Sequence, residues 1–196
     1  PMLVNGLLAE AEEAVLHNVA AVRAAGARQV VFTCPSCYHI WKHVYPGIAG
    51  EEMDSLELLH ATELLAGLVD EGRLPLGELD MTVTYHDPCD LGRKSGIFDE
   101  PRQVIEGVPG VELREMDGSR EEALCCGGGG DVQIVDESVT AAVADRRLGQ
   151  AQRTGARLVL SACQQCKRTL MAAARRNKVR VRVMDVAELV WRAMEG

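Results

Sequence analysis

Apolar and polar positions follow two different rhythms along this chain. Between Leu8 and Val22, apolar side chains recur every three or four residues, which is the spacing of one helix face, and Gly26 marks the expected helix end. The same spacing predicts further helices over residues 61–69, from Asp131 to about Thr154, and over 186–194.

Short β-rich runs lie between these helical segments. They cover residues 29–33, 56–59, 81–85, 111–114, 158–161 and 179–183. Strands that alternate with helices favour an α/β fold with mostly parallel sheets flanked by helices. Cysteines and a histidine follow several of the runs directly, at the position where open α/β sheets build their sites.

One stretch of sequence occurs twice. Residues 26–37 (GARQVVFTCPSC) align without a gap on residues 155–166 (GARLVLSACQQC), 129 positions later. By this offset, the first-copy counterparts of Cys89 and Cys125 would precede residue 1. The sequence therefore predicts two pseudo-repeated modules: residues 1–75 form a partial module with only its CxxC half, and residues 76–196 form a complete one. We expect such a chain not to be a complete functional unit by itself.

Composition and charge narrow the functional classes. Of the 196 residues, 47% are apolar, and 21 Lys and Arg against 29 Asp and Glu give a net charge of −8, which disfavours nucleic acid as a partner. The apolar runs are too short to predict direct membrane insertion, and we expect a cytoplasmic location. Residues 140–182 carry 11 basic side chains and one acid, so this segment forms either a solvated face or a docking surface for an acidic partner or anionic substrate.

Seven cysteines carry the strongest chemical information: Cys34, Cys37, Cys89, Cys125, Cys126, Cys163 and Cys166. An odd number with an adjacent pair suits a disulfide framework poorly and a metal site well. Structural zinc takes four ligands, whereas the complete module offers five cysteines in three places. Adjacent cysteines suit a larger cluster with several metal atoms. A vicinal disulfide at 125–126, a zinc ribbon and a thioredoxin-like CxxC remain alternatives.

Several neighbours of these cysteines are candidates for supporting roles. Gly127 and the three glycines after it let the backbone approach a cluster, and a helix from Asp131 would point its positive end at it. His86 could hydrogen-bond cluster sulfide, relay a proton as a catalytic residue, or hold a loop.

A second arrangement surrounds the first CxxC. Cys34, Cys37, His39 and His43 form C-x2-C-x-H-x3-H, which could close on one zinc. The alternative is a pair of free thiols beside two surface or packing histidines.

These motifs resemble the CCG-domain, or cysteine-rich-domain, family. The resemblance covers nearly the whole chain and rests on TCPSCYHIWKHVYP (33–46), HDPCDLGR (86–93), LCCGGGG (124–130) and SACQQC (161–166). The family includes the B- and D-type catalytic subunits of heterodisulfide reductase and iron–sulfur subunits of glycolate and lactate oxidases. The resemblance implies that five residues hold one noncubane 4Fe–4S cluster: Cys89, Cys125, Cys126, Cys163 and Cys166. Asp90 departs from the family, where histidine is frequent at this position.

We therefore expect an oxidoreductase subunit of heterodisulfide reductase type, acting in electron transport through one 4Fe–4S cluster. Cleaving a disulfide takes two electrons, which one-electron carriers deliver in succession. The first expected partner is an electron-donating iron–sulfur or flavoprotein subunit, through which the chain could associate with a membrane. We also expect a small thiol or disulfide substrate and a second copy of the chain. The alternatives are a pure electron-transfer subunit of a flavin-linked 2-hydroxy-acid dehydrogenase and a zinc-bound interaction module.

Overall fold

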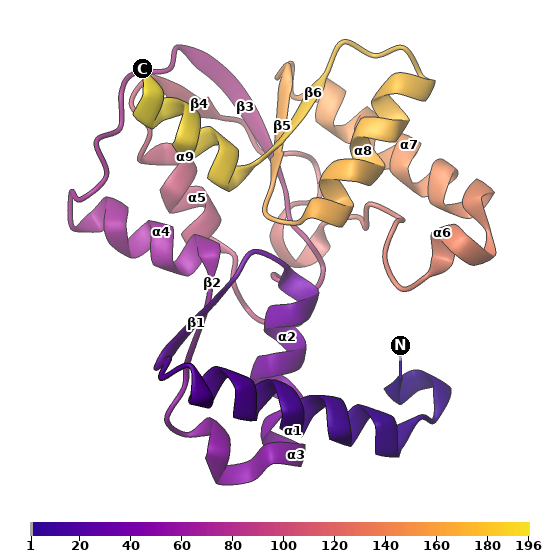
Figure 1. Cartoon of the computed structure of the whole chain (residues 1–196). Helices are drawn as coiled ribbons and strands as arrows, with labels where there is room; N and C mark the ends of the chain where they lie inside the picture. Colours follow the sequence, from indigo (N-terminus) through magenta and orange to yellow (C-terminus); the bar gives the residue numbers. More distant parts are fainter. Residues whose placement is uncertain (1) are drawn as a thin grey trace.

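The computed structural model describes residues 2–196, and the strands in this range form two parallel sheets (Figure 1). The smaller sheet pairs β1 (Gln29–Phe32) with β2 (Glu57–His60). The larger sheet has the order β4-β3-β5-β6 and comprises β3 (Met81–His86), β4 (Val111–Leu113), β5 (Leu158–Ser161) and β6 (Arg182–Asp185). Every neighbouring pair of strands runs parallel. The predicted α/β fold with parallel sheets is confirmed.

Helices flank these sheets. They are α1 (Leu8–Ala24), α2 (Pro35–His43), α3 (Pro46–Ala49), α4 (Ala61–Asp70), α5 (Asp99–Glu106), α6 (Val132–Val135), α7 (Glu137–Arg153), α8 (Gln164–Arg176) and α9 (Val186–Glu195). Short 3-10 turns occupy Leu3–Asn5, Gly50–Met53 and Arg120–Glu122. In Figure 1, α5 and α9 lie on one side of the larger sheet and α7 and α8 on the other. In the described part of the chain, no helix combines the length and the apolar character needed to cross a membrane.

The larger sheet is the centre of the core. Its strand β5 is buried at all four positions, because helices cover both of its faces. Leu160 faces the cluster of buried side chains that includes α5 and α9, whereas Val159 belongs to the cluster that contains Leu170 of α8. This alternation follows from the two-residue repeat of a strand.

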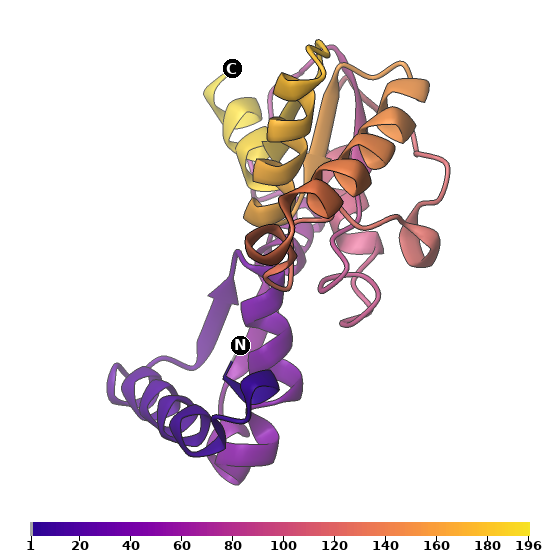
Figure 2. The same ribbon diagram turned by 90° about the vertical axis from the view of Figure 1, so that its right-hand side faces the viewer.

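The sequence repeat extends through whole elements of the structure. Helices α1 and α7 both have 17 residues and precede β1 and β5, each through a glycine of positive φ (71° at Gly26 and 76° at Gly155). Cys34 and Cys163 are the N-cap residues of α2 and α8. Helices α4 and α9 both begin with a capping box, His60 with Glu63 and Asp185 with Glu188. Figure 2 shows α1, α2 and α3 gathered around β1 in a lobe beside the larger sheet.

Several elements differ from the prediction. The helix predicted from Asp131 is broken at Asp136, which is extended (φ −149°, ψ 96°) and caps α7, so α6 is a single turn. The last strand begins at Arg182 and not at residue 179, because Lys178 adopts a left-handed conformation (φ 53°) after α8 and delays the pairing of β6 with β5. Helix α5 was not predicted.

Candidate metal centre

Strand β3 and strand β5 bring distant cysteines to one edge of the larger sheet. Their last residues, His86 and Ser161, are partners in the parallel register. Cys89 follows β3 by three residues, and Cys163 follows β5 by two and opens α8. Since the carboxyl ends of parallel strands share one edge, the first and last cysteine segments of the module meet there.

The five cysteines of the module form one continuous set of thiols. Each thiol shifts the pKa of its neighbour in the series Cys89–Cys125, Cys125–Cys126, Cys126–Cys166 and Cys166–Cys163. Cys126, Cys163 and Cys166 are buried, whereas Cys89 and Cys125 are half-buried. The set is therefore anchored in the core at one end and accessible at the other.

Two of these sulfurs are favoured as thiolates. The neighbouring thiols of Cys126 and Cys89, together with the N–H of Gly127 (3.3 Å to Sγ), lower the pKa of Cys125 to about 2. The thiol of Cys166 lowers the pKa of Cys163 to about 7, helped by the Cys166 backbone N–H at 3.5 Å. Metal ligation requires deprotonated cysteines, so both positions are prepared to act as ligands.

The glycines after Cys126 bring the loop against α7 and α8. Gly127 has a φ of 86°, and its carbonyl accepts a hydrogen bond from Thr140 Oγ1 at 2.8 Å. A Cβ atom on Gly128 would lie 2.0 Å from Thr169 Oγ1 on α8. The glycine loop therefore packs closely against the helix that carries Cys166, and the predicted approach of its backbone to a cluster stays a prediction.

The amino end of a helix does lie at the cysteines, but it belongs to α8. The one-turn α6 follows the glycine loop, and the start of α7 is capped by its own Asp136, which accepts from Ser138 N at 2.9 Å. At α8, by contrast, the Cys163 sulfur itself accepts the N–H of Cys166. A negative sulfur at this position is stabilised by the helix dipole.

His86 is fully buried and reaches the same set of sulfurs. One of its ring nitrogens and the Sγ atoms of Cys126 and Cys166 lie within 4.8 Å of one another. Its Nδ1 accepts a hydrogen bond from Arg147 Nε at 3.0 Å, and its Nε2 has no hydrogen-bond partner among residues 2–196. Burial, followed by the positive charge of Arg147, lowers the pKa of His86 to about 3. The neutral ring at pH 7 favours the hydrogen-bonding role predicted for His86, and the proton relay stays a prediction.

Arg147 was not singled out by the sequence, where it is one of 11 basic residues in a charged segment. In the structure it is fully buried, and burial lowers its pKa to about 10. The rest of the segment is divided: Arg153 pairs with Asp117, Lys167 with Glu188 and Arg176 with Asp145. The segment is thus no uniform charged face.

The first CxxC lies beside the centre but apart from its sulfurs. Asp90, next to Cys89, accepts hydrogen bonds from Ser36 in the first CxxC and from Lys94 (2.6 Å). Burial opposes ionisation of Asp90, yet these bonds hold its pKa below the usual range. Cys34 is half-buried and Cys37 is exposed, and burial together with the neighbouring Cys34 thiol raises the pKa of Cys37 to about 11.

The two histidines after this CxxC point elsewhere. His39 contacts Ser95 Oγ through Nδ1 at 3.3 Å and packs against the ring of His43. Over residues 2–196, the side chains close enough to share one ion are His86, Cys126 and Cys166, so the structure does not bring Cys34, Cys37, His39 and His43 together. All seven cysteines are free thiols in the described chain, including Cys125 and Cys126.

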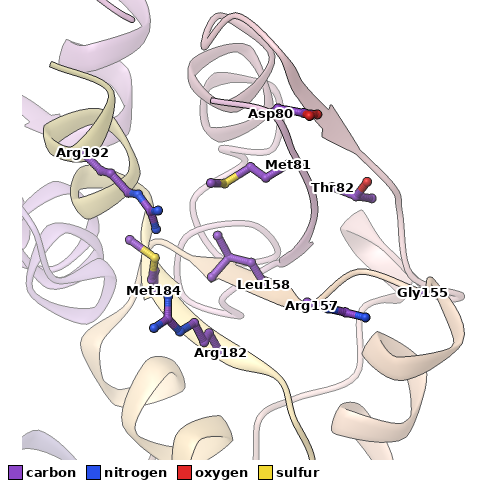
Figure 3. Close-up of a pocket in the computed structure, with 9 residues that line it drawn as sticks. All are labelled: Asp80, Met81, Thr82, Gly155, Arg157, Leu158, Arg182, Met184 and Arg192. Atoms are coloured by element: carbon purple, nitrogen blue, oxygen red, sulfur yellow. The ribbon is translucent and has the colours of Figure 1, made fainter. Parts of the chain in front are cut away.

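A separate cavity of about 400 Å³ lies at the opposite edge of the larger sheet (Figure 3). It is lined by the first residues of β3, β5 and β6, namely Met81, Leu158 and Arg182, and by Arg157 and Arg192. The cysteines follow the other ends of these strands, so this cavity is no part of the candidate centre.

Comparison with known proteins agrees with this geometry. Residues 83–171 match the CCG family, described as a cysteine-rich domain. The chain is 40% identical over 185 residues to the D-type subunit of the dihydromethanophenazine:CoB–CoM heterodisulfide reductase of Methanosarcina acetivorans, covering 94% of this chain and 45% of the relative. It is 32% identical to a Bacillus subtilis protein named "Probable iron-sulfur-binding oxidoreductase" (94% and 26% covered). It is 33% identical to the EtfAB:quinone oxidoreductase of Syntrophomonas wolfei (92% and 26% covered).

The chain spans about half the length of the heterodisulfide reductase subunits it matches, 45% and 44% for two of them. Among solved structures, an aspartate racemase homologue from Pyrococcus horikoshii superposes with a TM-score of 0.42 at 13% identity, covering 94% of this chain and 72% of that one. The resemblance recognised in the motifs is confirmed by the family match and by the relatives. The match to the CCG family of cysteine-rich domains extends over residues 83–171.

Proposed function

We propose that this chain is an iron–sulfur oxidoreductase subunit of heterodisulfide reductase type, whose cluster is held by five cysteines: Cys89, Cys125, Cys126, Cys163 and Cys166. The observation that carries the proposal is that three distant cysteine segments meet at one sheet edge, where each of the five thiols shifts the pKa of a neighbouring one. Relatives named as iron–sulfur-binding and heterodisulfide reductase proteins support the same assignment.

The residues fit an iron–sulfur cluster better than a single ion. Five sulfurs exceed the four ligands of structural zinc, and the adjacent Cys125 and Cys126 suit a group with several metal atoms. The lowered pKa values of Cys125 and Cys163 supply anionic ligands. When bound, such a cluster supplies one-electron transfer. The noncubane 4Fe–4S type is our finer proposal, supported by the five-cysteine set and the family resemblance.

The five cysteines differ in burial, and we assign different roles to the buried and the half-buried ones. Cys126, Cys163 and Cys166 anchor the group in the core, whereas the half-buried Cys89 and Cys125 face the accessible side, where a disulfide or an electron-donating subunit would approach. The relative named as a heterodisulfide reductase subunit favours disulfide reduction. The relative named as a quinone oxidoreductase favours the second candidate, electron relay between partner subunits. We place the chain in the cytoplasm, with any membrane association made through a partner.

The repeat supports a modular assignment. We infer that residues 1–75 are the second half of a first CCG-type module and that residues 76–196 are a complete module. The support is the matching order of α1, β1, α2, β2 and α4 against α7, β5, α8, β6 and α9. In this assignment Cys34 and Cys37 could ligate a metal only with ligands from another segment.

Metal analysis of the anaerobically prepared chain tests the proposal. We expect iron and acid-labile sulfide, together with an electron paramagnetic resonance signal that air destroys. Cys126→Ser and Cys163→Ser should remove most of the iron, whereas Cys37→Ser, the matched control from the other CxxC, should retain it. Zinc without iron, or equal iron loss in all three variants, would contradict the proposed centre.

A further inference from the structure

A fully buried arginine and a fully buried histidine stand behind the cysteine centre. Arg147 of α7 and His86 at the end of β3 are both 0% exposed, and they are joined by the 3.0 Å hydrogen bond from Arg147 Nε to His86 Nδ1. They lie 61 residues apart in the sequence, so the fold alone brings them together.

Arg147 lacks the partner that a structural buried arginine has. Its Nη1 donates to the carbonyl of Gly118 (2.9 Å) and to Gln150 Oε1 (2.8 Å), and its Nη2 has no hydrogen-bond partner in the described part of the chain. In the described chain, Arg147 forms no ion pair within 4.0 Å. The other buried arginine, Arg102, instead donates two hydrogen bonds to the carboxylate of Asp87. A buried charge without a carboxylate is costly, so a role beyond packing is indicated.

The hydrogen bond to Arg147 determines which nitrogen of His86 carries the proton. A guanidinium has donors and no acceptor, so Nδ1 of His86 must accept. In a neutral imidazole the other nitrogen then carries the hydrogen. The hydrogen on Nε2 therefore points away from Arg147.

Among the described residues, the metal-ligating side chains that lie close to His86 are those of Cys126 and Cys166. Their Sγ atoms and one ring nitrogen of His86 lie within 4.8 Å of one another. Nε2 is buried and, among the described residues, has no hydrogen-bond partner, so it keeps a free donor beside this group of sulfurs.

We propose that Arg147 is a positioning residue that fixes His86 in the Nε2–H tautomer, so that His86 donates a hydrogen bond to a sulfur of the cysteine centre. Metal sites commonly depend on such outer partners, and hydrogen bonds to sulfur are one determinant of the reduction potential of an iron–sulfur cluster. The effect on potential rests on the proposed function, whereas the tautomer and its orientation do not. Donation withdraws negative charge from sulfur and favours the reduced state.

The tautomer is tested first, on protein labelled with 15N-histidine before any iron is added. Nitrogen chemical shifts should show His86 with a protonated Nε2 and an unprotonated Nδ1, and the signal is assigned by its loss in His86→Gln. Arg147→Met should release the ring to a mixture of tautomers, while Arg153→Met, the same change at an exposed position of α7, should leave it unchanged. A protonated Nδ1 in the unmodified chain would overturn the proposal.

The second test measures the midpoint potential of iron-loaded protein by a redox titration followed by electron paramagnetic resonance. At matched iron content, His86→Phe and Arg147→Met should both shift the midpoint to more negative values, and Arg153→Met should not. Arg147→Gln and His86→Gln, which keep a side-chain N–H and most of the packing, should recover part of the shift and serve if the larger changes do not fold. Potentials equal to that of the unmodified chain in both His86 variants would overturn the donor role, and absence of iron from the unmodified chain would instead defeat the proposed function.

Discussion

Gly128→Ala should disturb the candidate centre through one contact. The added Cβ would lie 2.0 Å from Thr169 Oγ1, 2.8 Å from Gln165 Nε2 and 3.1 Å from Thr169 Cβ. Thr169 is buried, and its hydroxyl donates to the Gln165 carbonyl at 2.9 Å, so it has little freedom to move. Either α8 or the glycine loop must shift, and each carries cysteines of the centre.

The size of the effect follows from the cost of overpacking. An extra carbon in a filled site typically costs about 1–3 kcal/mol. For a chain of this length, 1 kcal/mol lowers the melting temperature by about 2–4 °C, so we expect a fall of roughly 2–12 °C. Thermal unfolding followed by circular dichroism measures this change, and iron content after anaerobic reconstitution should fall with it.

Gly129→Ala is the matched control one residue away. A Cβ there meets nothing within 4 Å, and Gly129 has no positive φ, so the change should be neutral or slightly stabilising. Thr169→Ala should rescue part of the loss in Gly128→Ala, because it removes the atom at 2.0 Å. Equal effects at both glycines, or no rescue, would refute the reasoning.

Two further changes test other buried groups. Arg102→Met should lower the free energy of unfolding by about 3–5 kcal/mol in a urea titration, because it leaves the buried Asp87 without its bidentate partner; a loss as small as that of Arg73→Met, at an exposed pair, would contradict it. Burial lowers the pKa of His60 from 6.5 to about 4. As the pH falls, His60 is therefore protonated in the unfolded chain before it is protonated in the folded chain. The free energy of unfolding should fall by up to about 3 kcal/mol as the pH drops from 6.5 to 4. His60→Asn, which can still cap α4, should remove this part of the pH dependence, and an unchanged pH profile would exclude His60 as its source.

Much of the fold is predictable because the apolar residues whose spacing predicts a helix or strand are largely the residues that the folded chain buries. The strand before each CxxC and the helix over 8–24 follow the sequence signals closely. Helix α5 escaped prediction because it is short and largely polar, with acids in its first turn. Pro101, Val104 and Ile105 in this helix, with Val108 just after it, nevertheless have helical spacing and are buried, so a shorter window would have found it.

The cysteines of the candidate centre could be proposed from their spacing together with the family resemblance, but the pairing of Arg147 with His86 behind them could not. Arg147 counts as one more charge when a segment is described by its net charge. Its place on the helix was informative: Thr140, Ala144, Leu148 and Ala151 are buried on one face of α7, and Arg147 falls on that face. Its partner His86 lies on β3, and only the tertiary fold selects that pairing.

The two copies of the repeat show which part of the fold builds the centre. Each copy places a CxxC at the start of a helix that follows a parallel strand, yet only Cys163 and Cys166 belong to the five-sulfur set. The two copies differ in the strands that pair with the one before each CxxC. β5 has β3 as a neighbour, which ends at His86 in register with Ser161 and is followed by the loop that carries Cys89. In the described chain, β1 by contrast pairs with β2 alone and remains partly exposed. A CxxC motif supplies two candidate ligands. The neighbouring strand and the loops that follow it supply the other residues of the candidate centre.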